Sequence, residues 1–311
     1  MQATDLKITM RLVYYELQKR GIEVKILSTE PSLIEYVYQG QSHLLHSTLG
    51  EKEPALAYAI AENKMLTSVI CEKMGWSHPA SRQYDEKTAG EFLERYHPVA
   101  VKPLNGAHGN GITLGVESKI QLVAAVERAK KFDKKILLQQ MVAGEDYRVL
   151  CIDGKYAAAL QRIPASVIGD GIHSIRELIM EENNNPERGT NYAKALEYIP
   201  LETAEAYLGS SIGSIPGSGE VVRVVGVPNL SSGGRAEDKT AIIPDSMKKM
   251  AIDIAKELRM GVCGVDFIWD GQTDPWVIEI NANPGIDMHD DPKFGSSQGV
   301  IKKLVDYLIA G

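Results

Sequence analysis

Apolar side chains recur at helical spacing between residues 5 and 20, and this pattern ends at Gly21. The next segment, "IEVKIL", alternates apolar and polar positions as a strand does. The stretches "YVYQG" and "QSHLLH" favour two more short strands. A small α/β unit is therefore expected over residues 1–62.

A second helical pattern begins at Pro54 and continues to Gly75, with Pro79 just beyond it as a stop signal. Asn63 and Lys64 interrupt its apolar positions. The pattern predicts one helix across this stretch.

Helices and strands alternate through the rest of the chain. Residues 88–96 favour a helix, and "PVAVKP", "ITLGV" and "KILLQQ" favour strands, with a glycine-rich loop between the first two. Ser118 with Gln121, and Ser174 with Glu177, have the spacing of a capping box that opens a helix. A hairpin is expected about Asp153 and Gly154. The sequence thus predicts a mixed α/β (α+β) fold in two or three subdomains.

The clearest helix is expected over residues 246–259, with Asp245 as its N-cap. Its apolar stripe is expected to be core, and consists of Met247, Met250, Ala251, Ile254, Ala255 and Leu258.

Composition narrows the class of protein. The 34 Lys and Arg residues against 41 Asp and Glu give a formal net charge of -7, which offers no overall field attractive to nucleic acid or an acidic membrane. Cys71, Cys151 and Cys263 lack zinc-ligand spacing, so we expect core thiols in a reducing compartment. No apolar stretch approaches the length of a signal peptide or membrane span, which favours a cytoplasmic protein with neither nucleic acid nor membrane as a partner.

Two polar residues stand in the apolar run "PWVIEINANPG". Because residues two apart in a strand share a face, Glu279 and Asn281 are expected to point together. Strict alternation places Trp276, Ile278 and Ile280 on the other face.

Asp266 lies in the preceding strand, "GVDFIW", and "DGQTDP" has the composition of a hairpin connection. A symmetric hairpin sets Asp266 directly across from Glu279. Like charges so placed destabilise a sheet unless a cation lies between them. Two carboxylates and the Asn281 carbonyl suit magnesium, with manganese as a substitute. A solvated strand face is the alternative interpretation.

The segment "VAVKPLNGAHGNGITLGV" places Lys102 at a strand end, followed by Gly106, Gly109 and Gly111. The spacing matches neither the Walker nor the Rossmann pattern. Glycines still let backbone N–H groups approach phosphates, and Lys64 and Lys102 could add charge. An ordinary flexible turn is the alternative.

Together these residues resemble the ATP-grasp ligases, from Lys64 to the C-terminus. The resemblance is to the ATP-grasp domain of cyanophycin synthetases and the glutathione synthetase module of bifunctional glutathione enzymes. The segments that carry it are "VKPLNGAHGNGI", "GEDYRVLCIDGKYAAALQRIPASVIGDGIHSIRELI", "NNNPERG", "VPNLSSGGRAEDKT", "GVCGVDF" and "VIEINANPGIDMHDDP".

The resemblance implies two α/β subdomains that clasp ATP, with 63–142 as the lid and nucleotide subdomain and 143–311 as the metal and substrate subdomain. It implies that ATP contacts Lys64, Lys102, Gly106, His108, Gly109, Gly111, Gln139, Gln140, Val142 and Asp146. The family usually has glutamate at the position of Gln139.

The same resemblance implies that Asp266, Glu279 and Asn281 hold magnesium and that Arg148 and Arg162 face the transferred phosphoryl group. Neither His173 nor His289 receives a catalytic role. The implied substrate-binding residues are Arg223, Asn229, Ser231, Ser232, Gly233 and Gly234.

By resemblance, the expected activity is ATP-dependent amide-bond formation between an amino acid or short peptide and an amine, through an acylphosphate. A ligase acting on a carrier protein or peptide, and an inactive ATP-binding partner subunit, are the alternatives. No Mur-ligase-like region follows, so repeated addition of two amino acids is not expected from this chain alone. A homodimer is expected by family analogy.

Overall fold

The computed structural model describes residues 1–105, 111–190, 196–292 and 294–310. Its described part forms two compact units. Unit 1 contains residues 1–80, 142–161 and 238–311, and unit 2 contains residues 81–141 and 162–237. The fold is mixed α/β with several sheets, as expected. The division at residues 62 and 142 stays a prediction, since compactness groups the chain differently.

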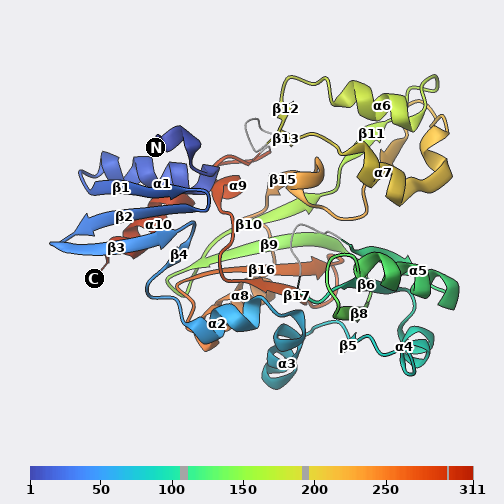
Figure 1. The fold of residues 1–311 in the computed structure, drawn as a ribbon, viewed down its shortest axis with the longest axis horizontal. Helices are drawn as coiled ribbons and strands as arrows, with labels where there is room; N and C mark the ends of the chain where they lie inside the picture. Colours follow the sequence, from blue (N-terminus) through green and yellow to red (C-terminus); the bar gives the residue numbers. More distant parts are fainter. Residues whose placement is uncertain (106–110, 191–195, 293, 311) are drawn as a thin grey trace. The chain divides into compact units, whose positions relative to one another are not determined.

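An antiparallel sheet in the order β1-β2-β3-β4 forms the N-terminal part of unit 1. Helices α1 and α10 lie side by side next to it (Figure 1). Buried apolar residues of the sheet and both helices, such as Met10, Ile34 and Leu304, share one core. The bounds of these elements are η1 (Ala3–Asp5), α1 (Ile8–Lys19), β1 (Glu23–Thr29), β2 (Ser32–Tyr38), β3 (Gln41–His46), β4 (Leu49–Gly50) and α10 (Val300–Ile309).

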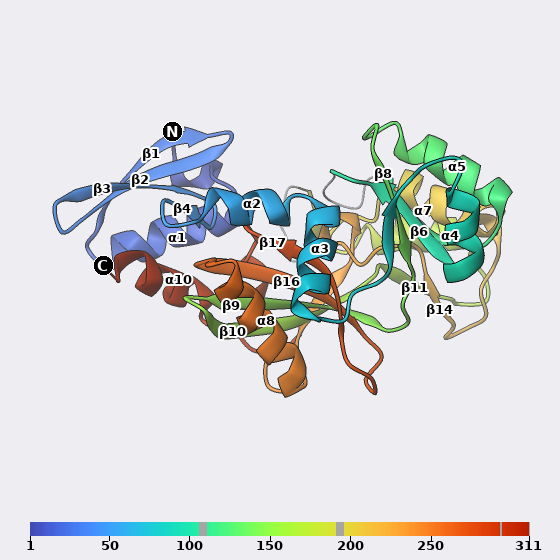
Figure 2. The same ribbon diagram turned by 90° about the horizontal axis from the view of Figure 1, so that it is seen from below.

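A five-stranded sheet in the order β15-β10-β9-β16-β17 carries the hairpin of interest. Helix α8 packs on β9 and β16, while α2 and α3 contact β17 (Figure 2). The bounds are α2 (Ala55–Ala61), α3 (Lys64–Met74), β9 (Glu145–Ile152), β10 (Lys155–Ile163), β15 (Arg235–Asp238), α8 (Asp245–Glu257), β16 (Val262–Trp269), β17 (Trp276–Asn281) and α9 (Asp287–Asp290).

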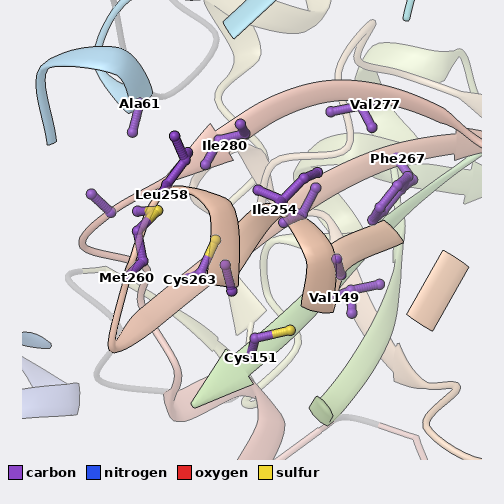
Figure 3. Packing of buried hydrophobic residues seen from close by; sticks show 14 of the residues in the cluster. Ala61, Val149, Cys151, Ile254, Leu258, Met260, Cys263, Phe267, Val277 and Ile280 are labelled. Carbon is purple, nitrogen blue, oxygen red and sulfur yellow. The ribbon is translucent and has the colours of Figure 1, made fainter. Parts of the chain in front are cut away.

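The core beneath α8 confirms the expected apolar stripe. Ile254 of α8 and Leu258, the C-cap of this helix, pack in one cluster with Val149 and Phe267 of the sheet (Figure 3). All three cysteines are free and buried in this cluster, as expected for core thiols. Burial raises the pKa of the Cys151 thiol to about 12, so it stays protonated and unreactive at neutral pH.

Two helix predictions were wrong in detail. Asp245 is the first residue of α8 and Pro244 is the N-cap, which makes no side-chain cap hydrogen bond. The single helix expected from Pro54 to Gly75 is two helices, α2 and α3. Asn63 separates them, because its side chain accepts hydrogen bonds from the N–H groups of Met65 and Leu66 and so starts a new helix.

The locally encoded turns were predicted correctly. The Ser118–Gln121 and Ser174–Glu177 capping boxes open α5 and α6. Asp153 and Gly154 join β9 to β10 with φ angles of 54° and 63°, the left-handed conformation of a tight hairpin turn.

Unit 2 contains an antiparallel sheet in the order β5-β8-β6-β7 together with helices α4 and α5. A separate apolar cluster joins α6, α7 and the β11–β14 pair. No described helix is long and apolar enough to cross a bilayer. The bounds are β5 (Ser81–Gln83), α4 (Ala89–Tyr96), β6 (Val99–Pro103), β7 (Thr113–Val116), α5 (Lys119–Ala129), β8 (Ile136–Gln140), β11 (Ser166–Ile168), α6 (Ile175–Glu182), β12 (Arg188–Gly189), β13 (Leu196–Glu197), α7 (Leu201–Leu208), η2 (Gly209–Gly213), β14 (Val221–Arg223) and η3 (Leu230–Ser232).

Candidate functional site

The hairpin formed by β16 and β17 places two carboxylates opposite each other. Asp266 and Glu279 are register partners, and Asn281 follows two residues later, opposite Gly264. The predicted pairing is therefore confirmed. Asp266 is only 3% exposed, so its charge lies in the protein rather than in solvent.

The expected alternation along β17 was wrong at one point. The register shifts between Asp266 and Phe267, where Glu279 and Val277 are the respective partners, so Ile278 is an extra residue in the ladder. Val277 consequently joins Ile280 in the core, while Trp276 and Ile278 stay partly exposed. Because of the bulge, Val277 and Ile280 both face the core even though they are three residues apart in the strand.

Arg148 neutralises Asp266 directly. The strands β9 and β16 bring the two residues into register, and the guanidinium Nε and Nη2 donate to Oδ1 and Oδ2 at 2.7 and 2.8 Å. This is a bidentate pair with little solvent on either side, because the side chains are 13% and 4% exposed.

Lys64, the first residue of α3, neutralises Glu279. Its Nζ lies 3.0 Å from Oε1, with the lysine side chain 8% and the glutamate side chain 30% exposed. The cationic charge expected beside these carboxylates is therefore present in the protein itself, while the metal ion stays a prediction. The case for a metal ion at this hairpin rests on the chemistry of its donor atoms.

That donor set fits a hard divalent cation. Asp266, Glu279 and Asn281 offer only oxygen donors, and magnesium takes few protein ligands and completes its shell with water and phosphate. Asn281 Nδ2 is buried without a hydrogen-bond partner, so this amide is incompletely satisfied as the structure stands. In the described ranges no three His, Cys, Asp or Glu residues gather as a metal site, so the amide oxygen is needed as the third protein ligand.

His289 on α9 is a further buried polar group in unit 1. It is 0% exposed, and neither ring nitrogen has a hydrogen-bond partner. Burial, reinforced by the Arg148 charge, lowers its pKa from 6.5 to about 3. The imidazole is therefore neutral across the physiological range.

The neutral His289 makes stability depend on pH. Below pH 6.5 the unfolded chain binds a proton at this residue and the folded chain does not, so acidification favours unfolding. Between pH 7.5 and 5 we expect the unfolding free energy of the wild type to lose about 2 kcal/mol more than that of His289→Gln. Urea unfolding followed by tryptophan fluorescence at both pH values measures this difference. Equal losses in the two proteins would contradict the pKa assignment.

The expected nucleotide residues fall in both units. In unit 2, Lys102 is 6% exposed and its Nζ donates to Gln139 Oε1 at 2.6 Å, while Gln139 Nε2 donates to the Ser81 hydroxyl at 2.9 Å. The Lys102 charge is thus held in place by a neutral partner. Gln140, at the end of β8, pairs in register with Val99.

Gly111 is required by both conformation and packing. Its φ is 74°, and an added Cβ would lie 2.6 Å from Cδ2 of Phe132. Gly106, His108 and Gly109 lie outside the described residues. In unit 1, Val142 and Asp146 are half-buried, and Asp146 is the register partner of Ile268.

The expected substrate loop belongs to unit 2. Asn229 accepts backbone hydrogen bonds from Ser232 and Gly234 through its carbonyl, and Ser231 is half-buried. Gly233 has a φ of 81°, and a Cβ there would lie 2.7 Å from Cγ1 of Ile199.

The arginines of unit 2 differ in their surroundings. Arg162 is 9% exposed near the end of β10. Arg223 donates to the carbonyls of Val225 and Gly226, so its guanidinium stabilises the backbone that follows β14. Arg188, for which no role was predicted, is 7% exposed and donates to the Gly233 carbonyl. Arg188 lies in the segment "NNNPERG", which is one of the segments that carry the family resemblance. That membership was the sequence signal for a role of Arg188.

Two family matches cover much of the chain. The prokaryotic glutathione synthetase ATP-grasp domain matches residues 64–170, and the RimK-like ATP-grasp domain matches residues 227–307.

Curated relatives and a solved structure agree with these matches. Cyanophycin synthetase from Trichormus variabilis is 32% identical over 94% of this chain and 34% of its own length. The glutathione biosynthesis bifunctional protein of Clostridium perfringens is 32% identical over 98% of this chain and 41% of its length. A crystal structure of a bifunctional glutathione synthetase from Pasteurella multocida matches with a TM-score of 0.69 and 28% identity, over 97% of this chain and 43% of that one.

This chain therefore spans less than half the length of each of these proteins. The two family models match regions that carry the β16–β17 hairpin, Lys102, Arg148 and Arg162, while Arg188 and Arg223 lie between those regions. By fold and by sequence, the chain belongs to the ATP-grasp ligase superfamily.

Proposed function

We propose that the chain is an ADP-forming carboxylate–amine ligase, which joins an amino acid or short peptide to an amine acceptor. The observation that carries the proposal is the β16–β17 hairpin, where Asp266 and Glu279 face each other and Asn281 follows. Three oxygen ligands in a fold whose family members bind ATP support a magnesium-dependent phosphoryl transfer.

In the proposed first step, an oxygen of the substrate carboxylate attacks the γ-phosphorus of ATP. The bond from that phosphorus to the bridging oxygen breaks, ADP leaves with the electron pair, and an acylphosphate forms. Lys102 and Lys64 bind phosphate oxygens, and Gln139 fixes the position of the Lys102 ammonium. Asp266, Glu279 and Asn281 would hold magnesium, which would neutralise negative charge on the phosphates.

In the second step, the lone pair of the acceptor amine attacks the acyl carbon. The bond from this carbon to the phosphate oxygen breaks, inorganic phosphate leaves, and the nitrogen loses a proton to give the amide. Arg162 and Arg148 stabilise the negative charge that develops on acyl and phosphate oxygens. No protein nucleophile takes part, so catalysis consists of positioning and electrostatic stabilisation.

The loop of residues 229–234 is proposed to bind the amino-acid substrate chiefly through the hydroxyls of Ser231 and Ser232, because the N–H groups of residues 232–234 donate to carbonyls within the loop. A carrier-bound acceptor and a homodimeric assembly both stay predictions for this chain.

The direct test is phosphate release with ATP, magnesium and pooled pairs of amino acids, with product masses read by mass spectrometry. A ligase releases phosphate only when both substrates are present, and the product mass equals the sum of the two minus water. ATP binding without substrate-stimulated release across the panel would favour an inactive nucleotide-binding subunit.

Lys102→Met tests the phosphate assignment separately. Removing one charge-assisted contact is expected to raise the KM for ATP roughly 10-fold and to leave the KM for the amino acid unchanged. Lys130→Met is the matched control, because Lys130 pairs with Glu127 on the exposed surface of the same unit. An unchanged KM for ATP in Lys102→Met would remove this residue from the nucleotide site.

A further inference from the structure

The segment "NNNPERG" lies beneath the loop of residues 229–234. Arg188 is 7% exposed, and its Nη1 donates to the carbonyl oxygens of Gly233 at 3.1 Å and Glu197 at 2.7 Å. Its Nε donates to Glu182 Oε1 at 2.9 Å. One buried guanidinium thus connects the end of α6, the strand β13 and the loop.

A second polar residue of the same segment completes the support. Asn183 accepts a hydrogen bond from the Ile199 N–H at 2.8 Å and donates to the Ile199 carbonyl at 2.9 Å. Ile199 is 1% exposed and lies against Gly233, where a Cβ would meet its Cα at 3.0 Å. The loop therefore rests on a fixed backbone and has no room to shift toward it.

We propose that Arg188 is a positioning residue for the amino-acid substrate. It holds the Gly233 carbonyl inward, so that the loop presents its outer groups in one conformation; this inference rests on the proposed function of residues 229–234. Arginine suits the task because its planar fork reaches three acceptors at once, which a lysine ammonium on a flexible stem does not. Asn183 and Ile199 fix the surface against which the loop packs.

Hydrogen–deuterium exchange, which requires no substrate, tests whether Arg188 orders the loop of residues 229–234. The N–H groups of Ser232, Gly233 and Gly234 donate to carbonyls within the loop, so their exchange reports its order. In Arg188→Gln we expect faster exchange in the peptide spanning 229–234, with Arg188→Lys intermediate. Arg176→Gln is the control, because Arg176 pairs with Glu205 at an exposed site of the same unit and should leave the loop unchanged.

Steady-state kinetics test whether Arg188 affects binding of the amino-acid substrate. The substrate used is the amino acid that supports phosphate release with ATP and magnesium. Arg188→Gln should raise the KM for that amino acid roughly 10- to 100-fold while ATP–magnesium affinity by calorimetry stays within about twofold. Arg188→Lys should recover part of the loss, and it also serves if Arg188→Gln does not fold. Unchanged loop exchange, or ATP affinity falling in step with the KM, would overturn the proposal. If no amino acid supports release, the proposed function fails while the exchange result still decides whether Arg188 orders the loop.

Discussion

Glu279→Gln is expected to slow phosphate release roughly 100- to 1000-fold, because it replaces a charged, proposed metal ligand with a neutral one at the proposed site of phosphoryl transfer. The side chain is 30% exposed, but its partner Lys64 is only 8% exposed and would lose its counter-charge, so the unfolding free energy should fall by about 1–3 kcal/mol, which still leaves the protein folded. Steady-state phosphate release and thermal melting of the same preparations measure both effects. The prediction is therefore loss of activity with retention of the fold.

Glu257→Gln is the matched control for this substitution. Glu257 pairs with Lys73 in the same unit, with side chains 39% and 65% exposed, and belongs to no proposed site. It should keep the wild-type rate and melting temperature. Wild-type turnover in Glu279→Gln would remove Glu279 from the metal site.

Arg148→Gln is expected to lower the unfolding free energy of unit 1 by about 3 kcal/mol. The substitution takes the bidentate guanidinium from Asp266, which is 3% exposed, and breaking a buried pair from one side is more costly than replacing both partners. All three tryptophans, Trp76, Trp269 and Trp276, lie in unit 1. Urea unfolding followed by tryptophan fluorescence therefore reports this unit.

Two further variants make the Arg148 result interpretable. The double substitution Arg148→Met with Asp266→Leu should regain most of the lost stability, because it removes both charges together. Lys249→Gln, which breaks an exposed pair with Asp253 on α8, should cost less than about 0.5 kcal/mol. A loss below about 1 kcal/mol in Arg148→Gln would show that the pair contributes little.

Local signals accounted for the elements that were predicted correctly. Ser118 with Gln121 forms a cap from residues three apart, and Asp153 with Gly154 forms a turn from adjacent residues, so both depend on little beyond their own sequence. The Asp266–Glu279 pairing was predictable for the same reason, since one short connection sets the register of a hairpin.

Contacts between distant segments were not predictable from these patterns. The Arg148–Asp266 pair depends on β9 lying next to β16, and the two residues are 118 positions apart. The bulge at Ile278 leaves no residue signature, so strict alternation misplaced Val277. The break at Asn63 did have a local signal, because asparagine is a favoured N-cap, but the apolar pattern on both sides concealed it.

Unit 1 is assembled from three stretches separated by long insertions, and this has a consequence for synthesis on the ribosome. Thr9 donates to Asp287 across 278 residues, and Thr48 donates to Asn283 across 235. Such contacts close very long loops, so they form late in folding. The N-terminal sheet and α1 are therefore synthesised before α10, which covers the core they share. Their apolar surface stays exposed until residues 300–309 have been translated. We therefore expect a chaperone that recognises apolar surface to bind this nascent N-terminal segment.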